Sequence, residues 1–339
     1  MPGAASRRVE FTALAFGIAL LIVAAEPMAA FDLQGHRGAR GLRPENTLAG
    51  FSEALAIGVT TLETDLAITR DDVVVLSHDP LLNPDIVRGP DGAWLAAPGP
   101  AIRTLSLTDL ARFDIGRIRP GSAYAQEFPR QKPVDGERIP TLAALFALAA
   151  TSGKTPRFNI ETKIDPAKPD ETPDPETFAR LVVEAVWRAG VASRTTIQSF
   201  DWRTLLAAHR IAPDIETVCL TIETADMNTV GTRASLPSPQ PSPLPSPWLA
   251  GVDVGRQGSS VPALVSAAHC ATWSPYWLDV TAANVAEAHA LGLKVVPWTV
   301  NEASGMAAMI AMKVDGLITD YPDLGRQSLA AQGIALAPR

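Results

Sequence analysis

The chain has 339 residues, of which 47% are hydrophobic and 19% are charged, so it holds enough apolar material for one large core or two of medium size. Its formal net charge is −7 and no stretch is rich in Lys and Arg, which argues against nucleic acid as a partner. Two cysteines, Cys219 and Cys270, are too few for a disulfide scaffold or a thiolate metal site. The sequence favours two small buried side chains there and leaves a disulfide open, since an oxidising compartment would allow them to pair.

Residues 1–30 have the composition of an export signal. Arg7 and Arg8 form a short basic region, and residues 11–25 are uncharged and apolar. This apolar run is shorter than the roughly 20 residues that a spanning helix needs, so we expect cleavage, with Ala30 the favoured last residue of the leader, rather than anchoring. The mature protein is therefore expected to be periplasmic or secreted, without a stable membrane span.

After the leader, short runs rich in β-branched residues alternate with stretches of helical period, which is typical of βα units and a parallel sheet. The expected strands are residues 31–35, 61–67, 157–163, 195–200, 217–221, 271–276, 294–300 and 316–320. The expected helices are residues 47–57, 141–150, 176–189, 202–209, 261–269, 282–291, 303–312 and a last one after residue 323. Such a series predicts a (β/α)₈ TIM barrel over residues 31–330, because this fold takes about 250 residues and more with insertions.

Two segments exceed what a barrel needs. Residues 80–138 are rich in Pro, Gly and polar residues and lie between the second strand and its helix, so we expect a small inserted subdomain. Residues 236–248 alternate Pro and Ser, which cannot hold regular structure, and predict an extended surface loop.

Polar side chains stand at the C-terminal ends of the expected strands, where barrel enzymes place their reactive groups. His36 follows the first strand, and His78 ends a short extended run after the second. Glu63 and Asp65 are two apart in one strand, so their side chains project to the same face. Glu161 projects inward at a similar level from the neighbouring strand. Later strands contribute Gln198, Trp298 and Asp320.

These residue types suit metal-assisted phosphodiester cleavage. Three carboxylates within a few Å would repel one another unless a cation lay between them, so Glu63, Asp65 and Glu161 predict a site for Ca²⁺ or Mg²⁺. The two histidines suit acid–base work because their ordinary pKa is near neutrality. One would assist attack while the other protonates the leaving alkoxide, with the metal clamping the phosphate oxygens.

Each of these residues also has a structural interpretation. A lone Glu or Asp in a barrel strand is more often an ion-pair partner than a ligand, and a lone His is more often a satisfied hydrogen-bonder. Five such residues on three consecutive strand ends favour the catalytic interpretation. Three other histidines lie in or at the end of amphipathic helices away from this rim, so we expect structural roles for His209, His269 and His289.

Eight short blocks occur in a fixed order along the chain. They are residues 35–38 (GHRG), 44–47 (PENT), 63–65 (ETD), 77–79 (SHD), 159–163 (NIETK), 198–200 (QSF), 298–301 (WTVN) and 315–322 (DGLITDYP). Together they resemble the signature of the glycerophosphodiester phosphodiesterases, from about Asp32 to Asp323. The resemblance implies that His36 and His78 are the acid–base pair, that Glu63, Asp65 and Glu161 bind the metal, and that Arg37, Lys163 and Trp298 contact the phosphate or the rest of the substrate.

The resemblance also implies a small-molecule substrate. Members of this family hydrolyse deacylated phospholipids, such as glycerophosphocholine or glycerophosphoethanolamine, to glycerol 3-phosphate and the free alcohol. Attack by the neighbouring glycerol hydroxyl and attack by water both stay open, as do the head group, the choice of metal and the oligomeric state. The alternatives are a phospholipase of C or D type that cleaves intact lipid with the same histidines, and a noncatalytic phosphate-binding barrel.

Two further segments have a structural and a functional interpretation. Residues 44–47 suit a helix start capped by Asn46 or Thr47, and Glu45 is also near enough in sequence to bind the metal or to contact one of its ligands. The inserted subdomain carries aromatic residues that either pack within it or contact a head group: Trp94, Phe113, Tyr124 and Phe128.

Overall fold

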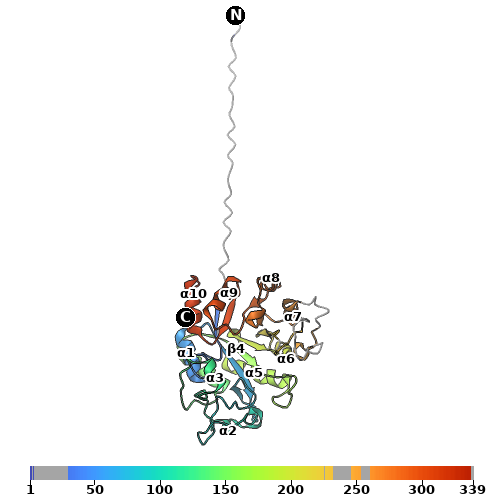
Figure 1. Ribbon diagram of the computed structural model, residues 1–339. Coiled ribbons are helices and arrows are strands. Elements are labelled where there is room, and N and C mark those ends of the chain that lie inside the picture. Colours follow the sequence, from blue (N-terminus) through green and yellow to red (C-terminus); the bar gives the residue numbers. More distant parts are fainter. Residues whose placement is uncertain (2, 4–29, 225, 232–245, 253–259, 337–339) are drawn as a thin grey trace.

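The computed structural model describes residues 1, 3, 30–224, 226–231, 246–252 and 260–336. Parallel strands pair in the order β8-β7-β6-β5-β4-β2-β1-β9, and helices surround them (Figure 1). The strands are β1 (Asp32–Gly35), β2 (Thr61–Ile68), β4 (Arg157–Thr162), β5 (Thr195–Ser199), β6 (Glu216–Thr221), β7 (Thr272–Pro275), β8 (Lys294–Val295) and β9 (Gly316–Thr319). Backbone hydrogen bonds from Asp315 to Val295 and from Ile318 to Pro297 close the ring. The fold is the predicted (β/α)₈ barrel.

The outer layer contains all the expected helices, each within a few residues of its predicted bounds. They are α1 (Leu48–Ile57), α4 (Leu142–Thr151), α5 (Pro175–Ala189), α6 (Trp202–Ile211), α7 (Val261–Ala267), α8 (Ala282–Ala290), α9 (Ala303–Ala311) and α10 (Pro322–Ala331). The first and last of them, α1 and α10, lie side by side (Figure 1). No helix in the described ranges is long and apolar enough to cross a membrane.

The two faces of each strand have different environments. In β4, Phe158 and Ile160 are fully buried in the core between strands and helices. Asn159 and Glu161 alternate with them and therefore point into the barrel lumen. This alternation places the polar residues of the strand in the barrel lumen.

The segment after β2 forms the inserted structure that the composition predicted. Strand β3 (Val74–Leu76) pairs antiparallel with β2, and the short helices α2 (Leu107–Leu110) and α3 (Ala123–Glu127) follow it (Figure 1). It has an apolar cluster separate from the main core, which includes Leu82, Val87, Ile102, Leu110 and Ile115. Such a cluster is consistent with a small subdomain at this end of the barrel.

The structure differs from the prediction at the two cysteines and at the strand expected over residues 294–300. Cys219 and Cys270 form a disulfide with their Cα atoms 5.9 Å apart, which is the alternative that the sequence favoured less. The strand expected over residues 294–300 is regular only in Lys294–Val295, because Pro297 lacks an N–H and interrupts the ladder. The leader and nearly all of the Pro/Ser loop lie outside the described residues.

Candidate active site

Three carboxylates meet inside the barrel at the C-terminal ends of two neighbouring strands. Glu63 and Asp65 project from β2, and Glu161 projects from β4 directly opposite Asp65 in the strand register. One oxygen of each carboxylate lies within 4.8 Å of the others, and the three residues are 1%, 0% and 6% exposed. The structure therefore brings together the three residues that the sequence predicted as metal ligands.

The electrostatics of this group suit a bound cation. Burial and the charge of Asp65 raise the pKa of Glu63, and burial raises the pKa of Glu161 to about 7 although Lys163 opposes it. Burial would also raise the pKa of Asp65, but the Arg37 guanidinium holds it below its usual range. Among the described residues, the buried Oδ1 of Asp65 has no hydrogen-bond partner. An oxygen-only donor set with one unused buried oxygen fits a hard divalent cation.

His36 is held by a second carboxylate on the last strand. Its Nδ1 lies 2.7 Å from Oδ1 of Asp320, which also accepts hydrogen bonds from Arg40 and Asn301. Asp320 is ionised and can only accept, so Nδ1 carries the proton and Nε2 is left with its lone pair. Nε2 lies 4.0 Å from Oε2 of Glu63, and burial lowers the pKa of His36 against the opposing charge of Asp320.

His78 is held in a similar way by the carboxylate of the next residue in the chain. Its Nδ1 is 2.7 Å from Oδ1 of Asp79, whose other oxygen accepts a hydrogen bond from Asn83 at 2.7 Å. Burial, followed by the charges of Arg37 and Lys163, lowers the pKa of His78 to about 4. Both histidines are thus neutral at pH 7, and both line a cavity of about 130 Å³ beside the carboxylates.

The two predicted phosphate-binding cations line the same cavity and are ion-paired with its carboxylates. Arg37 Nη1 donates to Oε1 of Glu45 at 2.8 Å, and its Nε is 3.2 Å from Oδ2 of Asp65. Lys163 Nζ is 2.8 Å from Oε1 of Glu161. The Arg37 backbone N–H also donates to Oε2 of Glu63 at 2.8 Å, which fixes the turn after β1 against the site.

That turn requires a glycine. Gly38 has φ +90°, and a Cβ placed there would lie 2.8 Å from the backbone carbon of Gly50 in α1. The positive φ and the short distance both disfavour an L side chain. Gly38 therefore allows the turn that keeps Arg37 close to the carboxylates.

Residues 44–47 and Gln198 make further contacts around the carboxylates. Of the two caps that the sequence allowed, Thr47 caps α1, and the Asn46 amide donates instead to Oδ2 of Asp65 at 3.0 Å. Glu45 pairs with Arg37 and accepts from the Tyr124 hydroxyl, so it lies one contact away from the carboxylate group. Gln198, noted only as a strand-end residue, donates from Nε2 to Oε1 of Glu63 at 2.7 Å.

A larger cavity of about 400 Å³ adjoins the site and shares His78, Glu161 and Lys163 with it. Its aromatic wall comes from Phe200, Trp248 and Trp298, and the Phe200 and Trp298 rings meet edge to face at 5.3 Å between centroids. None of the subdomain aromatics Trp94, Phe113, Tyr124 and Phe128 lines either cavity in the described part of the chain. Phe128, for example, is 3% exposed and lies against the Arg40 guanidinium.

A barrel whose lumen holds buried carboxylates and two anchored histidines defines a class, the phosphodiester-cleaving barrel hydrolases. Comparison with known proteins gives the family. The model of the glycerophosphoryl diester phosphodiesterase family matches residues 36–324, so the chain belongs to that family and is a glycerophosphodiester phosphodiesterase.

Individual relatives of known family are similar to this protein over most of its length. A glycerophosphodiester phosphodiesterase of Bacillus subtilis is 26% identical over 85% of this chain and 83% of its own length. The solved structure of a candidate glycerophosphoryl diester phosphodiesterase from Silicibacter pomeroyi is 34% identical, with a TM-score of 0.78 over 91% of this chain and 96% of that one. An Oleispira antarctica phosphodiesterase, solved with its product sn-glycerol-3-phosphate, is 22% identical with a TM-score of 0.62 over 88% of this chain and 96% of its own, and supports the fold.

Proposed function

We propose that this enzyme hydrolyses the diesters left by deacylation of phospholipids to sn-glycerol 3-phosphate and an alcohol, using one divalent cation and two histidines. The observation that carries the proposal is the pair His36 and His78, each fixed at Nδ1 by a carboxylate beside the buried group Glu63, Asp65 and Glu161. The product in the Oleispira antarctica structure supports the choice of substrate.

Glu63, Asp65 and Glu161 would hold Ca²⁺ or Mg²⁺. When bound, the cation supplies Lewis-acid polarisation of the phosphate oxygens and neutralises developing negative charge. The three carboxylates accept either ion, and an exported enzyme would meet abundant Ca²⁺. Arg37 and Lys163 line the same space, where their charges would orient the phosphate.

The positions of the two histidines relative to the cavities suggest which one acts as base and which as acid. His78 borders the larger aromatic cavity and His36 does not, so His78 faces the alcohol side of the phosphate and His36 the opposite side. His36, neutral at Nε2, would accept the proton of the attacking hydroxyl, whether of glycerol or of water. Burial, together with the charges of Arg37 and Lys163, holds the pKa of His78 low. A bound phosphate that neutralises the two charges would raise this pKa and prepare His78 to protonate the leaving oxygen.

Trp298 completes the substrate contacts in this proposal. Its indole Nε1 donates to the Ser274 carbonyl at 3.0 Å, which fixes the ring at the junction of the two cavities. The aromatic wall of Phe200, Trp248 and Trp298 would contact the alcohol portion, in place of the subdomain aromatics.

The experiment is an assay of product identity and metal dependence. Purified enzyme is given glycerophosphocholine or intact phosphatidylcholine, and glycerol 3-phosphate, phosphatidic acid and phosphocholine are measured before and after treatment with EDTA. We expect glycerol 3-phosphate from the first substrate only, loss of activity with EDTA and recovery with Ca²⁺ or Mg²⁺. Full activity in the metal-free protein would exclude the cation, and cleavage of phosphatidylcholine alone would favour a phospholipase.

We propose further that the enzyme acts outside the cytoplasm after removal of residues 1–30. The basic and apolar leader supports this location, and so does the Cys219–Cys270 disulfide, since disulfides persist mainly in oxidising compartments. Cell fractionation together with N-terminal sequencing of the purified protein tests the location. An intracellular protein that keeps its leader would contradict it.

A further inference from the structure

One half of the barrel lumen is polar from one mouth to the other. Its inward-facing residues come from β1, β2, β4 and β5, and they are Asp32, Gln34, Glu63, Asp65, Asn159, Glu161, Thr196 and Gln198. The facing strands are mixed: Val218, Leu220, Val296 and Ile318 are apolar, whereas Thr272 and Lys294 are polar and lie at the N-terminal mouth. Branched apolar residues usually fill such an interior, so the polar half calls for an explanation.

A continuous line of side-chain hydrogen bonds runs through this polar half. Gln34 Nε2 donates to Oδ2 of Asp32 at 2.8 Å. Asn159 Nδ2 donates both to Oε1 of Gln34 at 2.9 Å and to Oε1 of Gln198 at 2.8 Å. Gln198 Nε2 then donates to Oε1 of Glu63 at 2.7 Å. A carboxylate at one mouth is thereby connected through three amides to a proposed metal ligand at the other.

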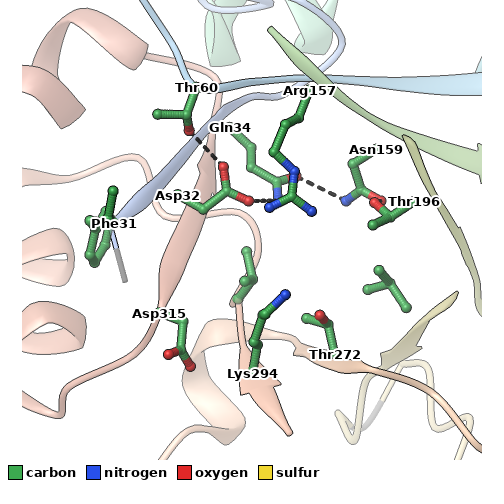
Figure 2. A pocket seen from close by; sticks show the side chains of 13 residues that line it. Phe31, Asp32, Gln34, Thr60, Arg157, Asn159, Thr196, Thr272, Lys294 and Asp315 are labelled. Atoms are coloured by element: carbon green, nitrogen blue, oxygen red, sulfur yellow. Dashed lines mark hydrogen bonds between the residues drawn. The ribbon is translucent and has the colours of Figure 1, made fainter. Parts of the chain in front are cut away.

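The Asp32 end of the line lies at a third cavity, of about 310 Å³, at the N-terminal ends of the strands. Figure 2 shows Asp32, Gln34 and Asn159 joined across the wall of this cavity. Asp32 also accepts hydrogen bonds from the hydroxyls of Thr60 and Thr61, both at 2.6 Å. With these partners its carboxylate is fixed and can only accept from Gln34.

The two carboxylates dictate the orientation of every amide between them. With Glu63 ionised, as a bound cation requires, each end of the line accepts only, so Gln34 and Gln198 must both turn their NH₂ groups outward and their carbonyl oxygens toward the centre. The residue at the centre must therefore supply two donors. Asn159 does so with the two hydrogens of one NH₂ group, and its Oδ1 accepts from the Thr196 hydroxyl at 2.9 Å.

We propose that Asn159 is a positioning residue for the metal site. It holds Gln198 with its NH₂ toward Glu63, and the Gln198 amide together with the Arg37 backbone N–H then fixes one hydrogen bond on each oxygen of the Glu63 carboxylate. The carboxylate is thus oriented before a cation binds. This inference rests on the proposed function, because it takes Glu63 to be a metal ligand.

The substitution Asn159→Leu tests it. Leu has a similar size and no donors, so Gln198 loses the contact that sets its orientation. Outer contacts of metal ligands typically contribute 10- to 100-fold to affinity. We expect Ca²⁺ binding by the metal-free variant, measured by titration calorimetry, to weaken by about tenfold or more. The kcat should fall with little change in KM, since Asn159 contacts no substrate cavity at the catalytic mouth.

Thr196→Val is the matched control. It removes a neighbouring lumen hydroxyl that donates to Asn159 but leaves the order of the amides intact, so Ca²⁺ affinity should stay within about twofold. If Asn159→Leu does not fold, Asn159→Asp replaces it. If only charge mattered, the added carboxylate would tighten Ca²⁺ binding. We expect weaker binding, because the variant lacks the NH₂ group that donates to both Gln34 and Gln198.

The outcomes separate the two proposals. Wild-type protein that binds neither Ca²⁺ nor Mg²⁺ would overturn the proposed metal site and this inference with it. Wild-type protein that binds Ca²⁺, together with an Asn159 variant that binds it as tightly, would overturn the positioning role alone. Equal losses in the Asn159 and Thr196 variants would also overturn it, because they would indicate general loosening of the lumen.

Discussion

At the scale of single residues, each proposed catalytic histidine depends on the carboxylate behind it. Asp320 and Asp79 accept a hydrogen bond from the Nδ1–H of His36 and His78 respectively, so each ring offers Nε2 to the cavity. An Nδ1–H bonded to a carboxylate fixes the tautomer and stabilises the imidazolium when it forms. Acid–base groups of this kind typically contribute 10²- to 10⁴-fold to a rate, each in its own step.

Replacing either histidine by Ala should therefore lower kcat on glycerophosphocholine by roughly a hundredfold or more. Ca²⁺ affinity should change little, because neither ring belongs to the carboxylate group. Steady-state kinetics and calorimetry measure the two effects. His209→Ala is the control, since His209 stacks on His269 away from the site. Near-normal turnover in both the His36 and the His78 variant would exclude the acid–base assignment.

The anchoring residues show how far single positions can be predicted. Asp79 is adjacent to His78 in the sequence, so a local rule could have identified it. Asp320 lies 284 residues from His36, and only closure of the barrel makes them neighbours. Arg40 and Asn46 likewise act through side-chain directions that a sequence pattern does not contain, although the family blocks include or flank both positions.

At the scale of elements, the disulfide joins Cys219 in β6 to Cys270, which lies two residues before β7. Its cysteines are 51 residues apart, and a cross-link of that span restricts the unfolded chain by about 4 kcal/mol in the loop-entropy description. The double variant Cys219→Ser/Cys270→Ser should lose a similar amount of unfolding free energy. Urea unfolding with and without reductant measures this loss.

The control for that experiment is the wild-type protein after reduction of its disulfide. Reduced wild-type protein should unfold at nearly the same urea concentration as the double variant, and reductant should not affect the variant. Two titratable thiols in native, exported protein would contradict the disulfide itself.

Strand and helix positions could be predicted because hydrophobic periodicity is local. The two-residue spacing of Glu63 and Asp65 in β2 and the position of Glu161 in the neighbouring strand β4 predicted that the three carboxylates converge, and the strand register agrees. The aromatic wall of the larger cavity was not foreseen, since Phe200, Trp248 and Trp298 come from three separate segments. Tyr124 was considered for the head group, but it contacts Glu45 and Arg40.

At the scale of the whole molecule, the barrel buries three carboxylates together, and a cation or protons relieve the repulsion that remains beside Arg37 and Lys163. Burial raises the pKa of Glu161 to about 7 and also raises that of Glu63 in the metal-free protein. Below that pH, a cation must displace a proton from the site before it binds, and above it the carboxylates are already ionised. Cation binding therefore competes with protons over the range from about pH 6 to 8.

We accordingly expect Ca²⁺ to raise the melting temperature more at pH 8 than at pH 6. For each proton displaced, the apparent affinity should rise by up to about tenfold per pH unit until the pKa of the group is passed. His78 should not reverse this trend, because burial lowers its pKa to about 4 and leaves it neutral throughout this range, and burial lowers the pKa of His36 as well. Thermal unfolding with excess Ca²⁺ or EDTA at each pH measures the difference. Glu161→Gln removes one titrating ligand, so its Ca²⁺ stabilisation should be smaller and less dependent on pH. A stabilisation in the wild type that is equal at pH 6 and pH 8 would show that the ion binds away from these carboxylates.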